Sequence, residues 1–216
     1  NYIFINIFTY LHNFELKFAL MTLRYSFIEQ FGFVLLNEEL LDKTANFLKN
    51  KSVCEIGAGT GWLSYNLQQR GIDITPVDYK PCNDSDFGFK KLHTEVLISN
   101  GVDYLENNSP DVVILSWPDY DTSFASDILN VLKKGQTLIY IGEHEGGCTG
   151  DDYFFELLND KTKINEDTIK NITSSAIHIG NLKAINNKKL KFQRDIEKDY
   201  DSLLRIVSIP NINKLI

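Results

Sequence analysis

The segment SVCEIGAGTGW, residues 52–62, carries the strongest structural signal in this chain of 216 residues. It starts as a short apolar run, typical of a strand, and continues into three glycines at alternate positions, Gly57, Gly59 and Gly61. Glycine permits the positive φ angles of a sharp turn and lets a ligand approach the backbone closely. A helix that follows such a turn offers free N–H groups and the positive end of its dipole. The segment therefore predicts a strand, a turn and a helix, with a ligand site at the turn.

Short apolar runs alternate with helical stretches from about residue 52 to residue 141. Runs such as Val112–Leu115 are continuously apolar, as expected for strands that are covered on both faces. This alternation predicts an α/β fold, built from βαβ units around a mainly parallel sheet with right-handed crossovers. Near the end of the chain, Ser174–Ile179 and Leu204–Ile209 are expected to form two last strands at the sheet edge.

An acid precedes the first glycine of the turn by two residues. Dinucleotide-binding turns have the spacing G-x-G-x-x-G, whereas here the third glycine comes one residue early and Trp62 stands in its place. A carboxylate at this position repels a diphosphate but suits a cationic ligand, such as the sulfonium and amino groups of S-adenosylmethionine. The expected cofactor-binding residues at the turn are Glu55, Gly57, Ala58, Gly59 and Gly61.

Two later segments fit an adenosine cofactor. Asp78 follows the next expected strand, where a carboxylate can accept hydrogen bonds from both ribose hydroxyls of either cofactor type. Asn100 and Gly101 follow the third expected strand, where a side-chain amide can bond the amino group of adenine. Asn-Gly is also a strong turn dipeptide, so a simple turn is an equal interpretation of this pair.

Together these features resemble class I S-adenosylmethionine-dependent methyltransferases over roughly residues 25–160. The resemblance implies a Rossmann-like sheet of seven strands, mostly parallel, with helices on both faces and an antiparallel last hairpin. It implies that Glu55 and the glycines flank the methionine part of S-adenosylmethionine. It also implies that Asp78 holds the ribose, that Asn100 and Gly101 lie at the adenine, and that Ser116 ends the strand beside the cofactor.

The segment Ser116–Tyr120, with the sequence SWPDY, is similar to the (Asn/Asp/Ser)-Pro-Pro-(Tyr/Phe) motif of methyltransferases that act on amino nitrogens. It departs from that motif because Trp117 replaces the polar residue, unless Ser116 substitutes for it, and because Asp119 replaces the second proline. A Trp face attracts a sulfonium cation, and Asp119 can orient a nucleophile, act as a base or neutralise a cationic substrate. Trp117, Asp119 and Tyr120 are therefore candidate catalytic residues. The alternative is that Trp117 and Tyr120 pack beneath a loop.

A glycine-rich loop, residues 142–150, follows the fifth expected strand at the edge where α/β proteins bind ligands. Glu143 is the fourth candidate catalytic residue, as a substrate contact, and His144 is a candidate general base. The acids, His144 and Cys148 of this loop lack a recognised metal-ligand spacing, so no metal site is expected.

Composition and charge restrict the class of partner. The 29 acidic residues outnumber the 22 Lys and Arg, which gives a net charge of −7 and argues against an extended nucleic-acid surface. Three widely spaced cysteines without a CxxC pair fit a reducing compartment, so we expect a cytoplasmic protein.

The first twenty residues differ from the rest of the chain. Residues 1–20 are apolar but interrupted by His12, Glu15 and Lys17, which makes them a poor membrane span, and no transmembrane segment is expected. They are interpreted as a leader or an accessory helix, and residues 21–216 as one methyltransferase-like domain.

Three functions stay open from the sequence. The first is an enzyme that transfers a methyl group from S-adenosylmethionine to an N or O nucleophile of an unidentified substrate. The second is a catalytically silent binding module on the same fold. The third is a nicotinamide-dependent oxidoreductase, which the missing third glycine at residue 62 disfavours.

Overall fold

The computed structural model describes six parts of the chain, residues 22–81, 91–133, 135–143, 147–161, 163–164 and 203–208. Residues 22–31 form an N-terminal helix, and five helices follow it: α2 (Glu38–Leu48), α3 (Trp62–Gln68), α4 (Gly101–Asn107), α5 (Phe124–Val131) and α6 (Asp152–Lys161). The strands are β1 (Val53–Ile56), β2 (Ile74–Asp78), β3 (Leu97–Ile98), β4 (Val112–Ser116), β5 (Thr137–Gly142), β6 (Lys163–Ile164) and β7 (Leu203–Ser208).

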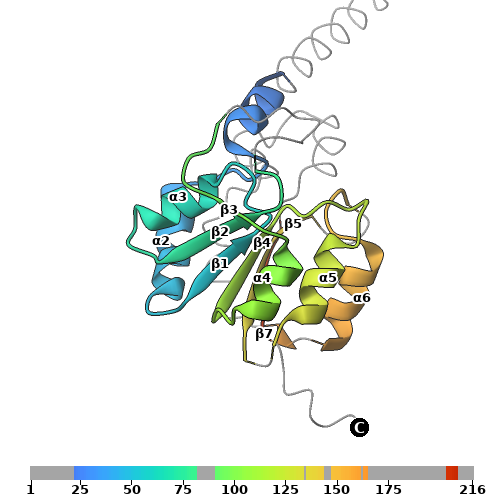
Figure 1. Ribbon diagram of the computed structural model, residues 1–216. Coiled ribbons are helices and arrows are strands. Elements are labelled where there is room, and N and C mark those ends of the chain that lie inside the picture. The colour runs from blue at the N-terminus through green and yellow to red at the C-terminus, as the bar shows by residue number, and fades with distance from the viewer. Residues whose placement is uncertain are drawn as a thin grey trace, which may run out of the picture.

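The strands form one twisted sheet in the order β3-β2-β1-β4-β5-β7-β6 (Figure 1). The pairs among β1 to β5 are all parallel, which confirms the predicted α/β fold with a parallel sheet. Beyond β5, β7 is antiparallel to β5 and β6 is antiparallel to β7. The expected strand Leu204–Ile209 corresponds to β7, whereas Ser174–Ile179 lies outside the described residues.

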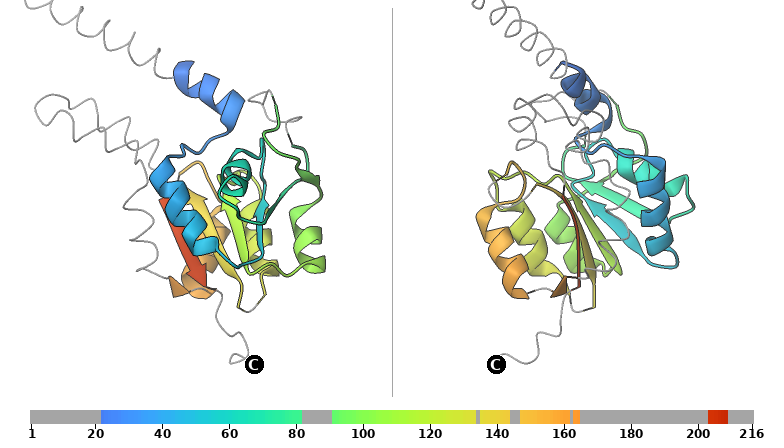
Figure 2. Two further views of the ribbon diagram at one scale, coloured as in Figure 1. Left: turned by 90° about the vertical axis from the view of Figure 1, so that its left-hand side faces the viewer. Right: turned by 180° about the vertical axis from the view of Figure 1, so that it is seen from behind.

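Helices cover both faces of the sheet (Figure 2). On one face, α2 and α3 pack on Val53, Ile74, Val112 and Ile114 of the central strands. On the other face, α4, α5 and α6 pack on the residues between these, such as Val113, with which they form a second core cluster. Because successive strand residues point to opposite faces, two apolar layers require continuously apolar strands, and β4 is fully buried from Val112 to Leu115.

Capping residues explain where two of the helices begin. Asn37 caps α2 by accepting a hydrogen bond from the backbone N of Leu40 (2.8 Å), as its position before two acids predicts. Asn100 caps α4 in the same way, through the backbone N of Val102 at 2.8 Å. Residues 100–101 were expected to form an adenine contact or a simple turn, and α4 was not expected, because it has only seven residues and little periodicity.

Candidate functional site

The glycine turn after β1 is held against the neighbouring strand. The backbone N–H groups of Gly57 and Ala58 both donate to the carbonyl of Val77 in β2, at 2.9 and 3.1 Å. Gly57, Gly59 and Gly61 all have positive φ, at 74°, 53° and 70°. At Gly61 a Cβ atom would also lie 2.9 Å from a methyl carbon of Thr94, so the turn has neither the backbone angle nor the room for a side chain.

Glu55 lies in β1 directly below the turn, with 3% of its surface exposed. Its Oε2 accepts hydrogen bonds from the backbone N (3.2 Å) and the hydroxyl (2.5 Å) of Ser64 in α3. Burial raises the pKa of Glu55 to about 7, and the nearby Asp78 adds to this rise while the Ser64 hydrogen bonds oppose it. The strand therefore holds a carboxyl group that changes its charge close to neutral pH.

Asp78 ends β2 on the opposite side of the turn. Its Oδ2 accepts a hydrogen bond from the backbone N of Gly59 (2.8 Å), and its Oδ1 accepts one from the backbone N of Lys80 (2.8 Å). The carboxylate therefore lies at the rim of the glycine turn, where the sequence placed it. The parallel pairing of β1 with β2 brings Glu55 and Asp78 to the same edge of the sheet.

These residues line a cavity at the carboxyl edge of the parallel strands. It holds about 640 Å³ of empty space, part of it open to solvent. Its walls come from residues 31–34, 57–60 and 116–117 together with Leu36, Glu55, Trp62, Leu63 and Asp78, whereas Gly61 is not among them. Glu55 and Asp78 are the charged residues among the described side chains that line it, and no Lys, Arg or His is among them. The cavity therefore presents carboxylates and backbone groups to a ligand, without a cation.

One wall of this cavity was not expected from the sequence, and it comes from the end of the N-terminal helix and the loop after it. The hydroxyl of Thr60 in the glycine turn donates to the carbonyl of Phe31 (3.0 Å), and the Phe31 ring lies 4.8 Å from the Trp62 ring. His93 Nε2 lies 2.7 Å from the carbonyl of Gln30. The sequence signal for a turn at this place is Gly32, which has φ of 91° and stands between two aromatic residues, Phe31 and Phe33.

Trp117 is the predicted acceptor-side residue that reaches the cavity. It has φ of 55°, which is unusual for a bulky residue and occurs at functional sites. Its backbone N donates to the carbonyl of Ile141 (2.7 Å), and its ring stacks on Phe33 with centroids 5.8 Å apart and planes 3° apart. Ser116 lines the cavity beside it. Trp117 thus packs against the N-terminal wall and lines the cavity at the same time.

Asp119 and Tyr120 lie just outside this cavity. Asp119 is exposed, and its Oδ1 accepts a hydrogen bond from the backbone N of Asp121 (3.2 Å). Tyr120 is 52% exposed, so the alternative that it packs beneath a loop is wrong. Asp119 also pairs with Thr149 through an isolated β-bridge, which joins the loops after β4 and β5 into one ledge.

Glu143 closes the loop after β5. Its carboxylate accepts a hydrogen bond from the backbone N of Cys148, and its own backbone N donates to the hydroxyl of Thr149 (2.6 Å). Glu143 is buried and is not part of the cavity wall. A substrate contact by Glu143 stays a prediction, with its carboxylate already engaged by the loop backbone. His144 lies outside the described residues.

Asn100 and Gly101 are not part of the cavity wall either. The side-chain oxygen of Asn100 is engaged in the α4 cap, so this pair begins a helix and is not a simple turn. At Gly101 a Cβ atom would lie 2.4 Å from a methyl carbon of Ile56, so glycine lets α4 pack against β1. Their role at an adenine ring stays a prediction.

The described residues were also compared with the requirements of a metal site and of a membrane-spanning helix. None of their His, Cys, Asp and Glu side chains gather in a group of three or more that suits a metal ion. None of the helices in this part of the chain has the length and apolar character needed to cross a membrane.

Comparison with known proteins gives matches to solved structures only. No known protein family and no curated protein matches the sequence. A glycopeptide N-methyltransferase with bound S-adenosyl-L-homocysteine is 10% identical, with a TM-score of 0.45, over 82% of this chain and 92% of that one. The magnesium protoporphyrin IX methyltransferase of Synechocystis is 14% identical, with a TM-score of 0.41, over 79% and 78%. The geranyl diphosphate C-methyltransferase of Streptomyces coelicolor is 13% identical, with a TM-score of 0.41, over 78% and 79%.

These scores are too low to support a conclusion about chemistry. The fold is instead established by the strand order of the chain itself, in which five parallel strands place β1 and its glycine turn at the centre. Helices cover both faces of this sheet, and the acid, the glycine turn and Asp78 meet at its carboxyl edge. The chain therefore has a Rossmann-like α/β fold with a mainly parallel sheet, as its resemblance to class I S-adenosylmethionine-dependent methyltransferases implies.

Proposed function

We propose that the protein is a methyltransferase that transfers a methyl group from S-adenosylmethionine to an N or O nucleophile. The observation that carries the proposal is the charge of the cavity, which has two carboxylates, Glu55 and Asp78, and no cation among its described lining residues. A nicotinamide cofactor would bring its diphosphate to the same turn, where the charged side chains among the described lining residues are both acidic. These two carboxylates therefore favour a cofactor with cationic sulfonium and amino groups.

The residues present fit such a cofactor. Glu55 is buried, lines the cavity and has partners for its Oε2 only among the described residues, which leaves Oε1 as an acceptor for an amino group. The glycine turn, with Gly57, Ala58, Gly59 and Gly61, allows the methionine part to approach the backbone. Asp78 at the rim would hold the ribose hydroxyls.

Further roles follow from the same resemblance. Asn100 and Gly101 would lie near the adenine, and Ser116 beside the transferred group. The antiparallel pairing of β7 with β5 and of β6 with β7 supports this resemblance, which implies an antiparallel last hairpin.

On the acceptor side, the chain has to align a nucleophile and exclude water. Trp117 offers a π face to a sulfonium, and stacking on Phe33 keeps that face in place. Asp119 and Tyr120 on the ledge would orient the acceptor, and Asp119 would take its proton where one must leave. Methyl transfer is an in-line displacement, so alignment supplies most of the catalysis.

A binding module without activity is the second candidate. The observation that favours it is the contact between Trp117 and Phe33, which lies where an acceptor has to approach the cofactor. Transfer of tritium from S-[methyl-³H]adenosylmethionine to amine and hydroxyl acceptors separates the two candidates, because a binding module retains the cofactor but labels none of them.

Thermal denaturation with added ligands tests the cofactor assignment. S-adenosylmethionine and S-adenosylhomocysteine at 100 times the dissociation constant are expected to add about 2.7 kcal/mol of stability, and NADH none. Gly59→Arg fills the turn and Asp78→Ala removes the ribose acceptor, so both variants are expected to lose this gain. Stabilisation by NADH alone would contradict the proposal.

A further inference from the structure

The two oxygens of the Glu55 carboxyl group have different surroundings. Oε2 accepts hydrogen bonds from the backbone N (3.2 Å) and the hydroxyl (2.5 Å) of Ser64, a residue of α3 with no exposed surface. Oε1 has no hydrogen-bond partner among the described residues, although Glu55 is 3% exposed and lines the cavity. Ser64 thus fixes one edge of the carboxyl group and leaves the other edge for a ligand.

The charges around Glu55 give Ser64 a second effect. Asp78 faces Glu55 across the turn and disfavours a second negative charge. Cys54 precedes it on β1, and burial raises the pKa of that thiol to about 12, so it stays neutral. With no Lys, Arg or His among the described cavity residues, the Ser64 hydrogen bonds are the interactions that favour the ionised carboxylate.

We infer that Ser64 is a positioning residue that orients Glu55 and sets the pH above which the amino group of the cofactor can bind. This inference rests on the proposed function. A cationic amino group favours ionised Glu55, so a neutral Glu55 must release its proton on binding. The Ser64 hydroxyl stabilises ionised Glu55, so removing it makes Glu55 release its proton less readily. A hydrogen bond to a charged group changes the proton dissociation constant by about tenfold.

The test is a calorimetric titration with S-adenosylhomocysteine between pH 5.5 and 9, for the wild type and S64A. We expect S64A to bind about tenfold more weakly at pH 6 and below, and about fivefold more weakly at pH 7, because the transition of Glu55 moves up by about one pH unit. The ratio of the two dissociation constants is expected to approach one by pH 9. The amino group of the ligand itself begins to lose its proton only at the upper end of this pH range, and this affects both proteins equally and leaves the ratio unchanged.

Two control variants separate positioning from packing. S126A removes a buried hydroxyl of α5, which donates to the carbonyl of Ser123 (2.9 Å). The ratio of the dissociation constants of S126A and the wild type is expected to stay constant with pH. In an E55Q background, S64A is expected to change the affinity little at any pH. S64C, which has a similar size and only a weak donor, gives the same comparison if S64A does not fold.

The possible outcomes are distinct. Two results would overturn the role of Ser64. One is a ratio of the S64A and wild-type dissociation constants that does not depend on pH, and the other is an equal loss of affinity from S64A in the wild type and in the E55Q background. Failure of the wild type to bind S-adenosylhomocysteine at any pH instead contradicts the proposed function.

Discussion

Glu55 is a carboxyl group buried in a central strand, so its ionisation links the stability of the fold to pH. The unfolded chain releases this proton near pH 4.5, whereas burial raises the pKa in the folded protein to about 7. Between these values the folded state holds the extra proton, and raising the pH favours unfolding. We expect the free energy of unfolding of the ligand-free protein to fall by about 3 kcal/mol from pH 4.5 to 7, as measured by urea denaturation.

The E55Q variant is the control for this prediction, because it keeps the shape of the side chain and removes its titration. Asp111 works in the opposite direction, since hydrogen bonds from Ser52 lower its pKa, but that transition lies below pH 4. An equally steep fall in E55Q would assign the effect to another group.

Trp117 lies between the cavity and the ledge that the loops around Asp119 and Thr149 form. Trp117→Ala removes the ring that stacks on Phe33 and is expected to keep the cofactor affinity within a few fold, because Glu55 and Asp78 remain. Turnover is expected to fall at least tenfold, since the acceptor loses an aligned wall. Binding is measured by calorimetry and turnover by tritium transfer. Loss of the cofactor along with activity would show that the division between cofactor side and acceptor side is wrong.

At the scale of the element, the start of α4 depends on one side chain. Asn100 accepts hydrogen bonds from the backbone N of Val102 (2.8 Å) and of Asp103 (3.4 Å). Asn100→Ala is expected to lower the free energy of unfolding by about 1 kcal/mol, and Asn100→Asp to preserve it, because Asp caps helices equally well. Thermal or urea unfolding of both variants measures this. Equal losses in the two variants would mean that the cap is not what Asn100 contributes.

The elements also show what the sequence could and could not predict. The strands β1, β2, β4 and β5 are apolar runs with clear ends, and the glycine turn fixes the start of α3, so each was expected close to its observed place. Helix α4 has seven residues and was missed, because so short a helix shows little periodicity.

Several of the predicted site residues lie together at the ends of neighbouring parallel strands, while their roles stay predictions. Glu55, Asp78, Ser116 and Trp117 meet in one cavity because parallel strands end at the same edge. The wall from residues 31–34 and Leu36 was not expected, since contacts between segments about thirty residues apart, such as Thr60 with Phe31, leave no local pattern. The sequence also does not show that the loop backbone engages the carboxylate of Glu143, whose substrate contact stays a prediction.

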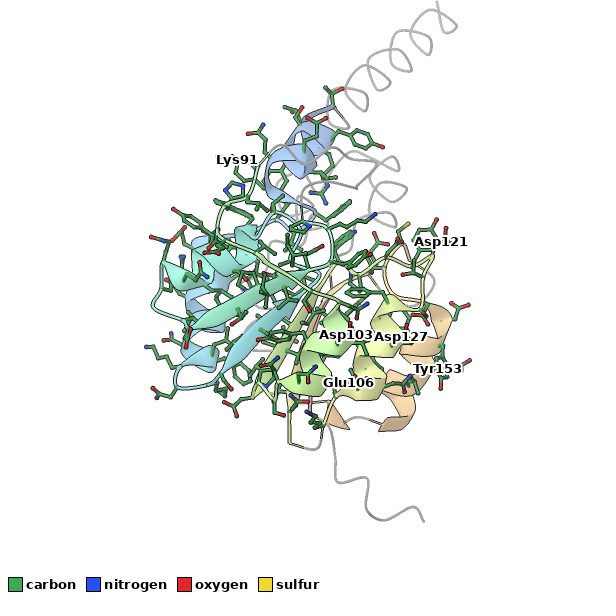
Figure 3. All side chains as sticks on the ribbon, viewed as in Figure 1. Lys91, Asp103, Glu106, Asp121, Asp127 and Tyr153 are labelled. Carbon is green, nitrogen blue, oxygen red and sulfur yellow. The ribbon has the colours of Figure 1, made fainter. Side chains whose placement is uncertain are left out.

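At the scale of the whole molecule, charge is unevenly distributed. Residues 111–160 contain ten Asp and Glu, against two Lys and no Arg. Figure 3 shows Asp121 beside the acceptor ledge and Asp127 on the outer face of the α4–α6 layer, whereas Lys91 lies on the opposite side near the N-terminal helix. This half of the molecule therefore presents a negative surface to an approaching substrate.

The charge distribution predicts that nucleic acid is a poor partner. A negative surface repels phosphates, and affinity for nucleic acid requires clustered Lys and Arg. We expect no binding of a labelled duplex DNA or of a single-stranded RNA in fluorescence anisotropy at 150 mM salt with about 10 μM protein. Saturable binding under these conditions would point to a basic surface beyond the described residues and contradict this prediction.

The most direct test of the account is a crystal structure of the protein with S-adenosylhomocysteine. The account predicts that the ligand fills the cavity at the glycine turn, with its amino nitrogen about 2.7–3.2 Å from an oxygen of Glu55 and its ribose hydroxyls on Asp78. A structure in which the ligand binds elsewhere, or in which the turn holds a diphosphate, would contradict it.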